Sequence, residues 1–191
     1  MQVIKCHAVA TMSAENTAPY GLVRDAAIVI QEGRISWVGP AERCPSVFSK
    51  STFTDFGDRL VTPSFVDCHT HIVSGGNRAQ EFEMRLNGAS YEEVARAGGG
   101  IVSTVSATRE ASFDALVSDA LPRIDAMIAE GTSLVEVKSG YGLDVETELK
   151  MLRAAKRLAE LRSIRIVTTF LGAHAVPPEF AGEPDRYIDE V

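Results

Sequence analysis

Two histidines separated by a single residue are the most chemically distinctive feature of this sequence. They end the run Phe65-Val66-Asp67-Cys68-His69-Thr70-His71, which is apolar enough to form a strand. Side chains alternate between the two faces of a strand, so Asp67, His69 and His71 are predicted to point the same way. Neutral imidazole is a common ligand of zinc, iron and related ions, but a catalytic zinc usually takes three protein ligands. The pair indicates part of a metal site, unless the rings only fill polar positions at a strand end.

Three further residues could contact a ligand near the same place. Arg78 follows a glycine-bearing loop, where its guanidinium could hold a carboxylate through two parallel hydrogen bonds or simply be solvated. Tyr141 stands between two glycines, so its ring is either presented to a ligand or packed against the protein. His174 ends a predicted strand segment and could bind metal or substrate, a choice that spacing does not make.

Lys138 and His7 also carry groups that could do chemistry. A lysine near a strand end beside a metal could be carbamylated into a bridging ligand, but Lys138 is expected to pair with Glu136, two positions earlier on the same face. His7 lies far from the other histidines in the sequence, and we interpret it as structural.

The elements that must position these residues follow a repeated order of strand, loop and helix from residue 60 onward. Predicted strands cover 64–73, 100–107, 133–139 and 165–173, and predicted helices cover 90–97, 111–130 and 144–161. Four βα units of this kind fit either an open doubly wound sheet or part of an eight-stranded barrel. Because four units cannot close a barrel, and residues 184–191 look like the start of another helix, we expect the amino-terminal half of a longer protein.

The first sixty residues have a different pattern. Segments 2–10, 26–30 and 34–38 are short and rich in Val and Ile, and Gln31-Glu32-Gly33 between the last two predicts a hairpin. A few short strands bury little surface alone, so this β unit is expected to pack on another layer.

Composition narrows the class of protein. The 191 residues are 45% hydrophobic and 24% charged, with a net charge of −7, which is ordinary for a globular protein and unfavourable for nucleic-acid binding. There is no apolar run of the ~20 residues that span a membrane and no secretory signal at the start, so we expect a cytoplasmic protein that binds no membrane. Three cysteines without a CxxC motif argue against disulfides and a thiolate zinc site.

Together, the motifs resemble the amidohydrolase superfamily. The resemblance is carried by Gly33-Arg34-Ile35-Ser36-Trp37-Val38-Gly39 followed by Thr62-Pro63-Ser64 and the two histidines, then by Gly75-Gly76-Asn77-Arg78-Ala79, Glu136 to Leu143, and Leu171 to Pro177. It implies an α/β fold, namely the amino-terminal half of a (β/α)8 TIM-like barrel preceded by part of a small β-sandwich. Residues 1–60 would belong to the composite β-sandwich domain and residues 61–191 to the first half of the barrel.

The resemblance also implies roles for individual residues. His69 and His71 would supply two ligands of one zinc or iron ion, whereas Arg78, Tyr141 and His174 would bind the substrate. The family has no carbamylated lysine, which leaves Lys138 as the partner of Glu136. The remaining metal ligands and the acid/base glutamate are expected beyond Val191, so no catalytic residue is assigned and this chain alone is expected to be inactive.

The implied reaction is hydrolysis of the cyclic amide of 4-imidazolone-5-propanoate to N-formimidoyl-L-glutamate, a step of histidine degradation. The complete enzyme is expected to be a homodimer. Two alternatives stay open: a related hydrolase acting on another cyclic amide or amidine, and a truncated, non-catalytic domain.

Overall fold

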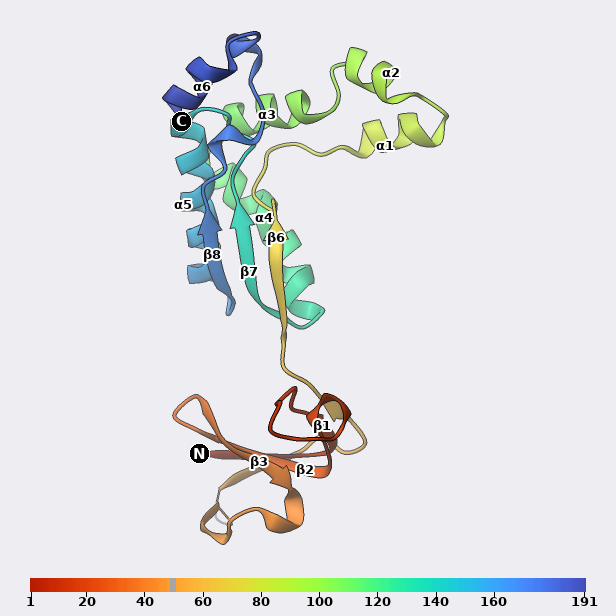
Figure 1. Ribbon diagram of the computed structural model, residues 1–191, viewed down its shortest axis with the longest axis vertical. Coiled ribbons are helices and arrows are strands. Elements are labelled where there is room, and N and C mark those ends of the chain that lie inside the picture. Colours follow the sequence, from red (N-terminus) through yellow and green to blue (C-terminus); the bar gives the residue numbers. More distant parts are fainter. Residues whose placement is uncertain (49–50) are drawn as a thin grey trace. The chain divides into compact units, whose positions relative to one another are not determined.

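Residues 1–48 and 51–191 are described by a computed structural model, in which the chain divides into two units, Met1–Ser64 and Phe65–Val191 (Figure 1). The strands are β1 (Gln2–Ala10), β2 (Leu22–Gln31), β3 (Arg34–Pro40), β4 (Thr52–Asp55), β5 (Leu60–Val61), β6 (Phe65–Thr70), β7 (Thr132–Lys138) and β8 (Arg165–Thr169). The α-helices are α1 (Ala79–Leu86), α2 (Tyr91–Arg96), α3 (Ile101–Glu110), α4 (Phe113–Ala129), α5 (Val145–Leu161) and α6 (Pro184–Glu190). Among the described residues, no helix combines the length and apolar character needed to cross a membrane.

The first unit is one mixed sheet with the strand order β3-β2-β1-β4, and β5 also pairs with β1. The predicted hairpin is confirmed: β2 and β3 are antiparallel and joined by Glu32 and Gly33, whose φ angles of 50° and 74° suit a two-residue hairpin turn. The sequence patterns did not predict β4 and β5, which are short and mostly exposed. The described residues of this unit make a single sheet, so a second facing sheet is not among them.

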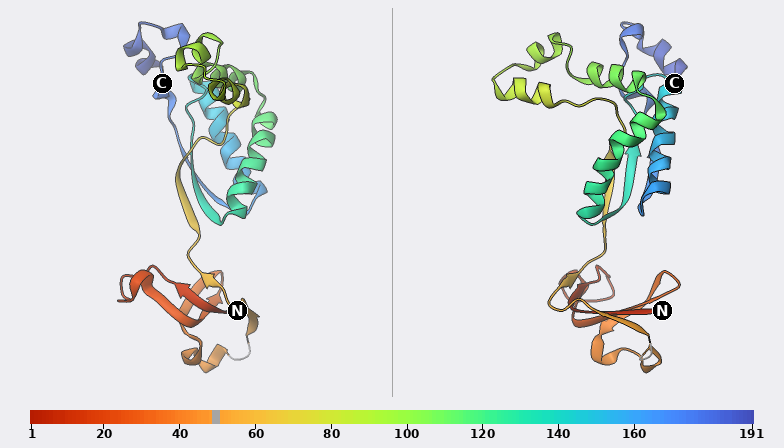
Figure 2. Two further views of the ribbon diagram at one scale, coloured as in Figure 1. Left: turned by 90° about the vertical axis from the view of Figure 1, so that its right-hand side faces the viewer. Right: turned by 180° about the vertical axis from the view of Figure 1, so that it is seen from behind.

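The second unit is built on three parallel strands in the order β6-β7-β8. Helices α4 and α5 lie together on one face of this sheet (Figure 2). Buried side chains from both helices and from β7, together with Val73 after β6 and Ile164 before β8, form the main core of the unit. The members from the helices and β7 are Leu116, Val117, Ala120, Ile124, Val135, Val137, Met151, Ala154, Ala155 and Leu158. A parallel sheet needs a helical layer of this kind, because both of its faces are normally covered.

One predicted strand is wrong. The sequence predicts a strand at residues 100–107, but α3 occupies Ile101–Glu110. The sheet of this unit therefore has three strands, where four βα units were predicted. The segment is rich in β-branched residues, and a short apolar run of this kind cannot be assigned to helix or strand by periodicity alone. In the helix, Val105 and Thr108 are buried one turn apart, a spacing that places both side chains on the same face.

The other predicted helices are present, and side chains cap the starts of α2 and α5. Ser90 and Glu93 form a reciprocal capping box at α2: the Ser90 amide donates to the Glu93 carboxylate at 2.7 Å, and the Glu93 amide donates to Ser90 Oγ at 3.2 Å. Asp144 caps α5 by accepting a hydrogen bond from the Thr147 amide at 2.7 Å. Helix α6 confirms the expected helix start at residue 184.

Candidate functional site

The two histidines of the HxH run lie side by side at the carboxyl end of β6. Their ring centroids are 5.6 Å apart, and Asp67 Oδ1 accepts a hydrogen bond from the His69 amide at 3.1 Å. His69 is exposed, whereas His71, one residue beyond the end of β6, is half-buried. The structure therefore brings both imidazoles to one place, as alternation along a strand predicts.

Tyr141 and His174 join His71 from two other strand ends. Tyr141 follows β7, and its ring centroid is 5.1 Å from that of His71. His174 follows β8 and stacks on His71 with centroids 5.1 Å apart and an angle of 23° between the ring planes. The ring centroids of Tyr141 and His174 are 5.7 Å apart. Parallel strands place their carboxyl ends at one edge of the sheet, so residues far apart in sequence gather there.

His71 is held in a state suited to a nitrogen ligand. Burial, followed by the neighbouring His174 and His69, lowers the pKa of the His71 imidazole. A lowered pKa keeps the ring neutral at neutral pH, and a neutral imidazole has a lone pair for a metal or a proton. Its Nδ1 atom is buried and has no hydrogen-bond partner among the described residues. An unpaired buried nitrogen is unfavourable unless a ligand or water completes it.

Arg78 lies on the wall of a cavity that also includes His71 and Tyr141. The cavity has a volume of about 360 Å³ and is lined by His71, Ser74, Gly75, Gly76, Asn77, Arg78, Thr104, Arg123 and Tyr141. Thr104 Oγ1 accepts a hydrogen bond from Arg78 Nε at 3.1 Å, which uses one of the five guanidinium donors. The Arg78 side chain is exposed, and this hydrogen bond holds its guanidinium on the cavity wall that also includes His71.

Lys138 pairs with Glu136, as the sequence indicates. Lys138 Nζ donates to Glu136 Oε1 at 2.6 Å. Hydrogen bonds from Lys138 and then Thr169 lower the pKa of the Glu136 carboxyl. His7 lies in the first unit, where its Nδ1 is 3.7 Å from Asp58 Oδ1.

Helix α3, which the sequence patterns did not identify, organises the loops around the cavity. Besides anchoring Arg78 through Thr104, it presents the fully buried Thr108, whose hydroxyl accepts a hydrogen bond from the Gly75 amide at 3.0 Å. Arg109 donates to the carbonyl oxygens of Gly142 at 2.6 Å and Leu143 at 3.1 Å. One helix thus holds both the loop after β6 and the loop after β7.

Glu148 is a second residue that sequence reasoning missed. It is fully buried near the start of α5, and its carboxylate accepts backbone N–H bonds from Gly140, Gly142 and Leu143 at 2.5, 2.6 and 2.8 Å. The loop that carries Tyr141 is therefore fixed by a buried charge. A glutamate in the first turn of a helix after a glycine-rich loop was the available signal, but such a residue is more commonly exposed.

Gly140 supplies a test of how tightly this loop and His174 fit together. Its φ is +115°, and a Cβ built there would lie 2.5 Å from His174 Nδ1. We expect Gly140→Ala to lower the free energy of unfolding by more than the ~1–2 kcal/mol that positive φ alone costs, measured by denaturant titration. The matched control is Gly88→Ala, where φ is +91° and nothing lies within 4 Å of the added carbon. Equal losses in the two variants would show that His174 is not packed against Gly140.

Comparison with known proteins gives close relatives along nearly the whole chain. No protein-family profile matches it. It is 66% identical over 182 residues to imidazolonepropionase of Ruegeria sp. (strain TM1040), an alignment that covers 95% of this chain and 44% of that protein. It is 55% identical over 191 residues to imidazolonepropionase of Paracoccus denitrificans (strain Pd 1222), covering 100% of this chain and 48% of that protein. The chain thus spans a little under half the length of these curated relatives.

Two solved structures show a similar fold at much lower identity. Zinc-complexed atrazine chlorohydrolase TrzN from Arthrobacter aurescens TC1 matches with a TM-score of 0.54 and 18% identity, over 89% of this chain and 35% of that one. Guanine deaminase from C. acetobutylicum, with bound guanine, matches with a TM-score of 0.52 and 16% identity, over 87% of this chain and 35% of that one. At such identities the likeness concerns the fold alone.

Proposed function

The chain belongs to the imidazolonepropionase family, and from that premise we propose that it is part of a metal-dependent hydrolase that opens the ring of 4-imidazolone-5-propanoate. In this reaction water adds to the ring carbonyl carbon, the bond from that carbon to the ring nitrogen breaks, and the nitrogen takes a proton. The product is N-formimidoyl-L-glutamate. This is the activity that the family resemblance implies, and the chain supplies part of the site for it.

The observation that carries the proposal is the single cavity lined by His71, Arg78 and Tyr141. The substrate has a carboxylate tail and a flat polar ring, and this cavity offers a cation, a phenol and an imidazole among its lining side chains. The guanidinium of Arg78 matches a carboxylate in charge and in the spacing of its donors. Arg78 is exposed, and it shares this cavity with His71, one of the two paired imidazoles.

The metal ion in this proposal is held by His69 and His71. The fit rests on the adjacency of the two rings and on the buried, unpaired Nδ1 of His71, whose lowered pKa favours the neutral ring. The described residues contain no group of three or more His, Cys, Asp or Glu side chains able to hold a metal, so the proposed single zinc or iron ion needs further ligands. When bound, such an ion lowers the pKa of water toward ~7 and polarises a carbonyl oxygen.

The chain's own residues bind and orient the substrate. Arg78 holds the propionate, and Tyr141 donates a second hydrogen bond to it. His174 contacts the ring. Because the Gly140 carbonyl can only accept, His174 Nδ1 donates to it across 3.1 Å, and Nε2 is the nitrogen that remains for the substrate. The acid/base glutamate that the family uses is assigned to no residue of this chain.

The same proposal extends to architecture. Residues 61–191 are proposed to be half of a (β/α)8 barrel and residues 1–60 part of a β-sandwich. The parallel β6-β7-β8 sheet with helices α4 and α5 on one face supports the first assignment. The five-stranded sheet of the first unit is compatible with the second.

A substrate panel tests the proposed function. We expect the complete-length protein, loaded with zinc or iron, to hydrolyse 4-imidazolone-5-propanoate with a kcat/KM far above its values for hydantoins and aminoimidazoles of similar size. Preference for a hydantoin or an aminoimidazole would assign the site to another cyclic amide or amidine. Absence of turnover of every compound by a metal-loaded, folded protein would contradict a hydrolase.

A further inference from the structure

We propose that Glu148 is a positioning residue, whose buried carboxylate fixes the loop from Ser139 to Asp144 and thereby orients Tyr141 and His174 toward His71. The inference rests on the proposed function, because it assigns Glu148 the role of supporting residues that are proposed to contact the substrate.

The first step is the burial of the Glu148 charge. The side chain is 0% exposed, in contrast to Glu146, which is exposed in the same turn of α5. An ionised carboxylate is strongly unfavourable in a protein interior unless hydrogen bonds replace its water. Here the replacement is three short bonds from backbone amides, with Gly140 on Oε2 and with Gly142 and Leu143 on Oε1. Bonds of this charge-assisted type are among the strongest in proteins.

The second step is the unusual backbone of the loop that these bonds hold. Gly140 has a φ of +115°, and Leu143, which carries a side chain, has a φ of +53°. Positive φ disfavours a residue such as leucine, so surrounding contacts must hold it there. Gly142 is packed closely against the start of α5, since a Cβ there would lie 2.7 Å from the Glu148 amide nitrogen. The carboxylate therefore stabilises a conformation that the loop would not adopt alone.

The third step links the loop to the proposed substrate contacts. Tyr141 lies between two of the three residues whose amides Glu148 binds, so the position of its ring follows from the loop. Gly140 also accepts the hydrogen bond from His174 Nδ1 at 3.1 Å. Both rings lie within 5.1 Å of His71, centroid to centroid. A change in the loop would therefore displace two of the three proposed substrate-binding residues together.

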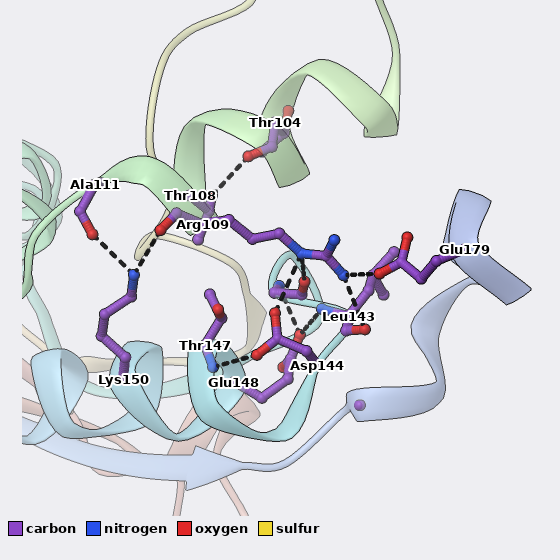
Figure 3. A network of polar contacts seen from close by, with 12 residues as sticks. Thr104, Thr108, Arg109, Ala111, Leu143, Asp144, Thr147, Glu148, Lys150 and Glu179 are labelled. Atoms are coloured by element: carbon purple, nitrogen blue, oxygen red, sulfur yellow. Dashed lines mark hydrogen bonds and ion pairs between the residues drawn. The ribbon is translucent and has the colours of Figure 1, made fainter. Parts of the chain in front are cut away.

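Arg109 holds the same loop from its carbonyl side (Figure 3). Its guanidinium also contacts Asp144 Oδ2 at 3.2 Å and Glu179 Oε1 at 2.7 Å. Glu148 binds the N–H groups of Gly140, Gly142 and Leu143, and Arg109 binds the C=O groups of Gly142 and Leu143, so groups of opposite charge hold the same stretch of backbone. Arg109 is partly exposed, with 30% of its side-chain surface accessible, and Glu148 is the buried member of the pair.

The test compares Glu148→Gln with Glu146→Gln in the complete-length protein. Glutamine keeps the size but has one acceptor oxygen, and its NH2 group faces an amide N–H, so the three bonds cannot all form. We expect hydrogen exchange in a peptide covering residues 139–144 to be accelerated about 10-fold or more in Glu148→Gln. We expect kcat/KM to fall about 10- to 100-fold, as displacement of contacts by ~1 Å does in enzymes. Glu146→Gln should change neither value.

Further variants separate this inference from the proposed function. Tyr141→Phe and His174→Asn are expected to lower kcat/KM without accelerating exchange as Glu148→Gln does. Faster exchange of the loop in Glu148→Gln with kcat/KM at the control value would overturn the positioning role. In that case, a lower kcat/KM in Tyr141→Phe and His174→Asn would still support the substrate assignment. If those two variants are also fully active, the substrate assignment fails, and the positioning role fails with it.

Exchange in the unaltered protein keeps the inference testable even if Glu148→Gln does not fold. The amides of Gly140, Gly142 and Leu143 are expected to exchange more than about 100-fold slower than that of the exposed residue Gly182. Exchange at equal rates would overturn the proposal without any variant.

Discussion

Replacing His71 with asparagine in the complete-length protein is expected to remove the bound metal and to lower kcat/KM by more than about 100-fold. Loss of a residue that merely orients a metal ligand costs 10- to 100-fold, so loss of a ligand should exceed that range. His71 is central to the site because its ring contacts those of His69, Tyr141 and His174. Metal content by atomic emission and initial rates with 4-imidazolone-5-propanoate measure the two effects.

His7→Asn is the matched control for this substitution. His7 is an exposed histidine of the first unit, beside Asp58, and we assign it no part in the site. It should retain metal and activity, whereas His69→Asn should behave like His71→Asn. Full metal content in both His69→Asn and His71→Asn would show that the paired imidazoles are not ligands.

Replacing Arg78 with lysine is expected to raise KM for 4-imidazolone-5-propanoate about 10- to 100-fold, with a smaller effect on kcat. Lysine keeps the positive charge but loses the planar pair of donors, and a hydrogen bond to a charged group contributes about 1.5–3 kcal/mol. Thr104 anchors Arg78 through Nε, a contact that lysine cannot reproduce. Steady-state kinetics of the complete-length protein measure both constants.

Two comparisons separate the loss of the contact between Arg78 and the substrate carboxylate from general effects of the substitution. Arg153→Lys changes an exposed arginine on α5 and should leave KM unchanged. A substrate analogue whose carboxylate is replaced by a carboxamide should bind the unaltered protein weakly and be little affected by Arg78→Lys. An unchanged KM in Arg78→Lys would remove Arg78 from the carboxylate contact.

Sequence patterns predicted most of the elements because each had a strong local signal. The buried strand β7 and the amphipathic helices α4 and α5 have clear apolar spacing and caps. Helix α3 was mistaken for a strand because β-branched residues dominate residues 101–108, and only tertiary packing of Val105 and Thr108 decides their state. The short strands β4 and β5 have no such apolar spacing, and they are strands because they pair with β1.

The site shows the same division between local and long-range information. His69, His71, Tyr141 and His174 could be predicted to meet, since each lies toward or just beyond the carboxyl end of a predicted strand and such ends share one edge. The supporting roles of Glu148 and Arg109 could not be predicted. Both side chains bind backbone groups, and the pattern of side-chain types along the sequence does not show which backbone groups a residue will bind. Arg109 reaches carbonyls 33 and 34 positions away along the chain. Only the folded loop shows that these two charges support Tyr141.

The most direct test of the account is a crystal structure of the complete-length protein with anomalous diffraction measured at the zinc or iron absorption edge. The account predicts one strong anomalous peak within about 2.0–2.2 Å of a ring nitrogen of both His69 and His71, beside the cavity that contains Arg78 and Tyr141. A peak elsewhere in the protein, or two imidazoles turned away from the metal, would contradict it.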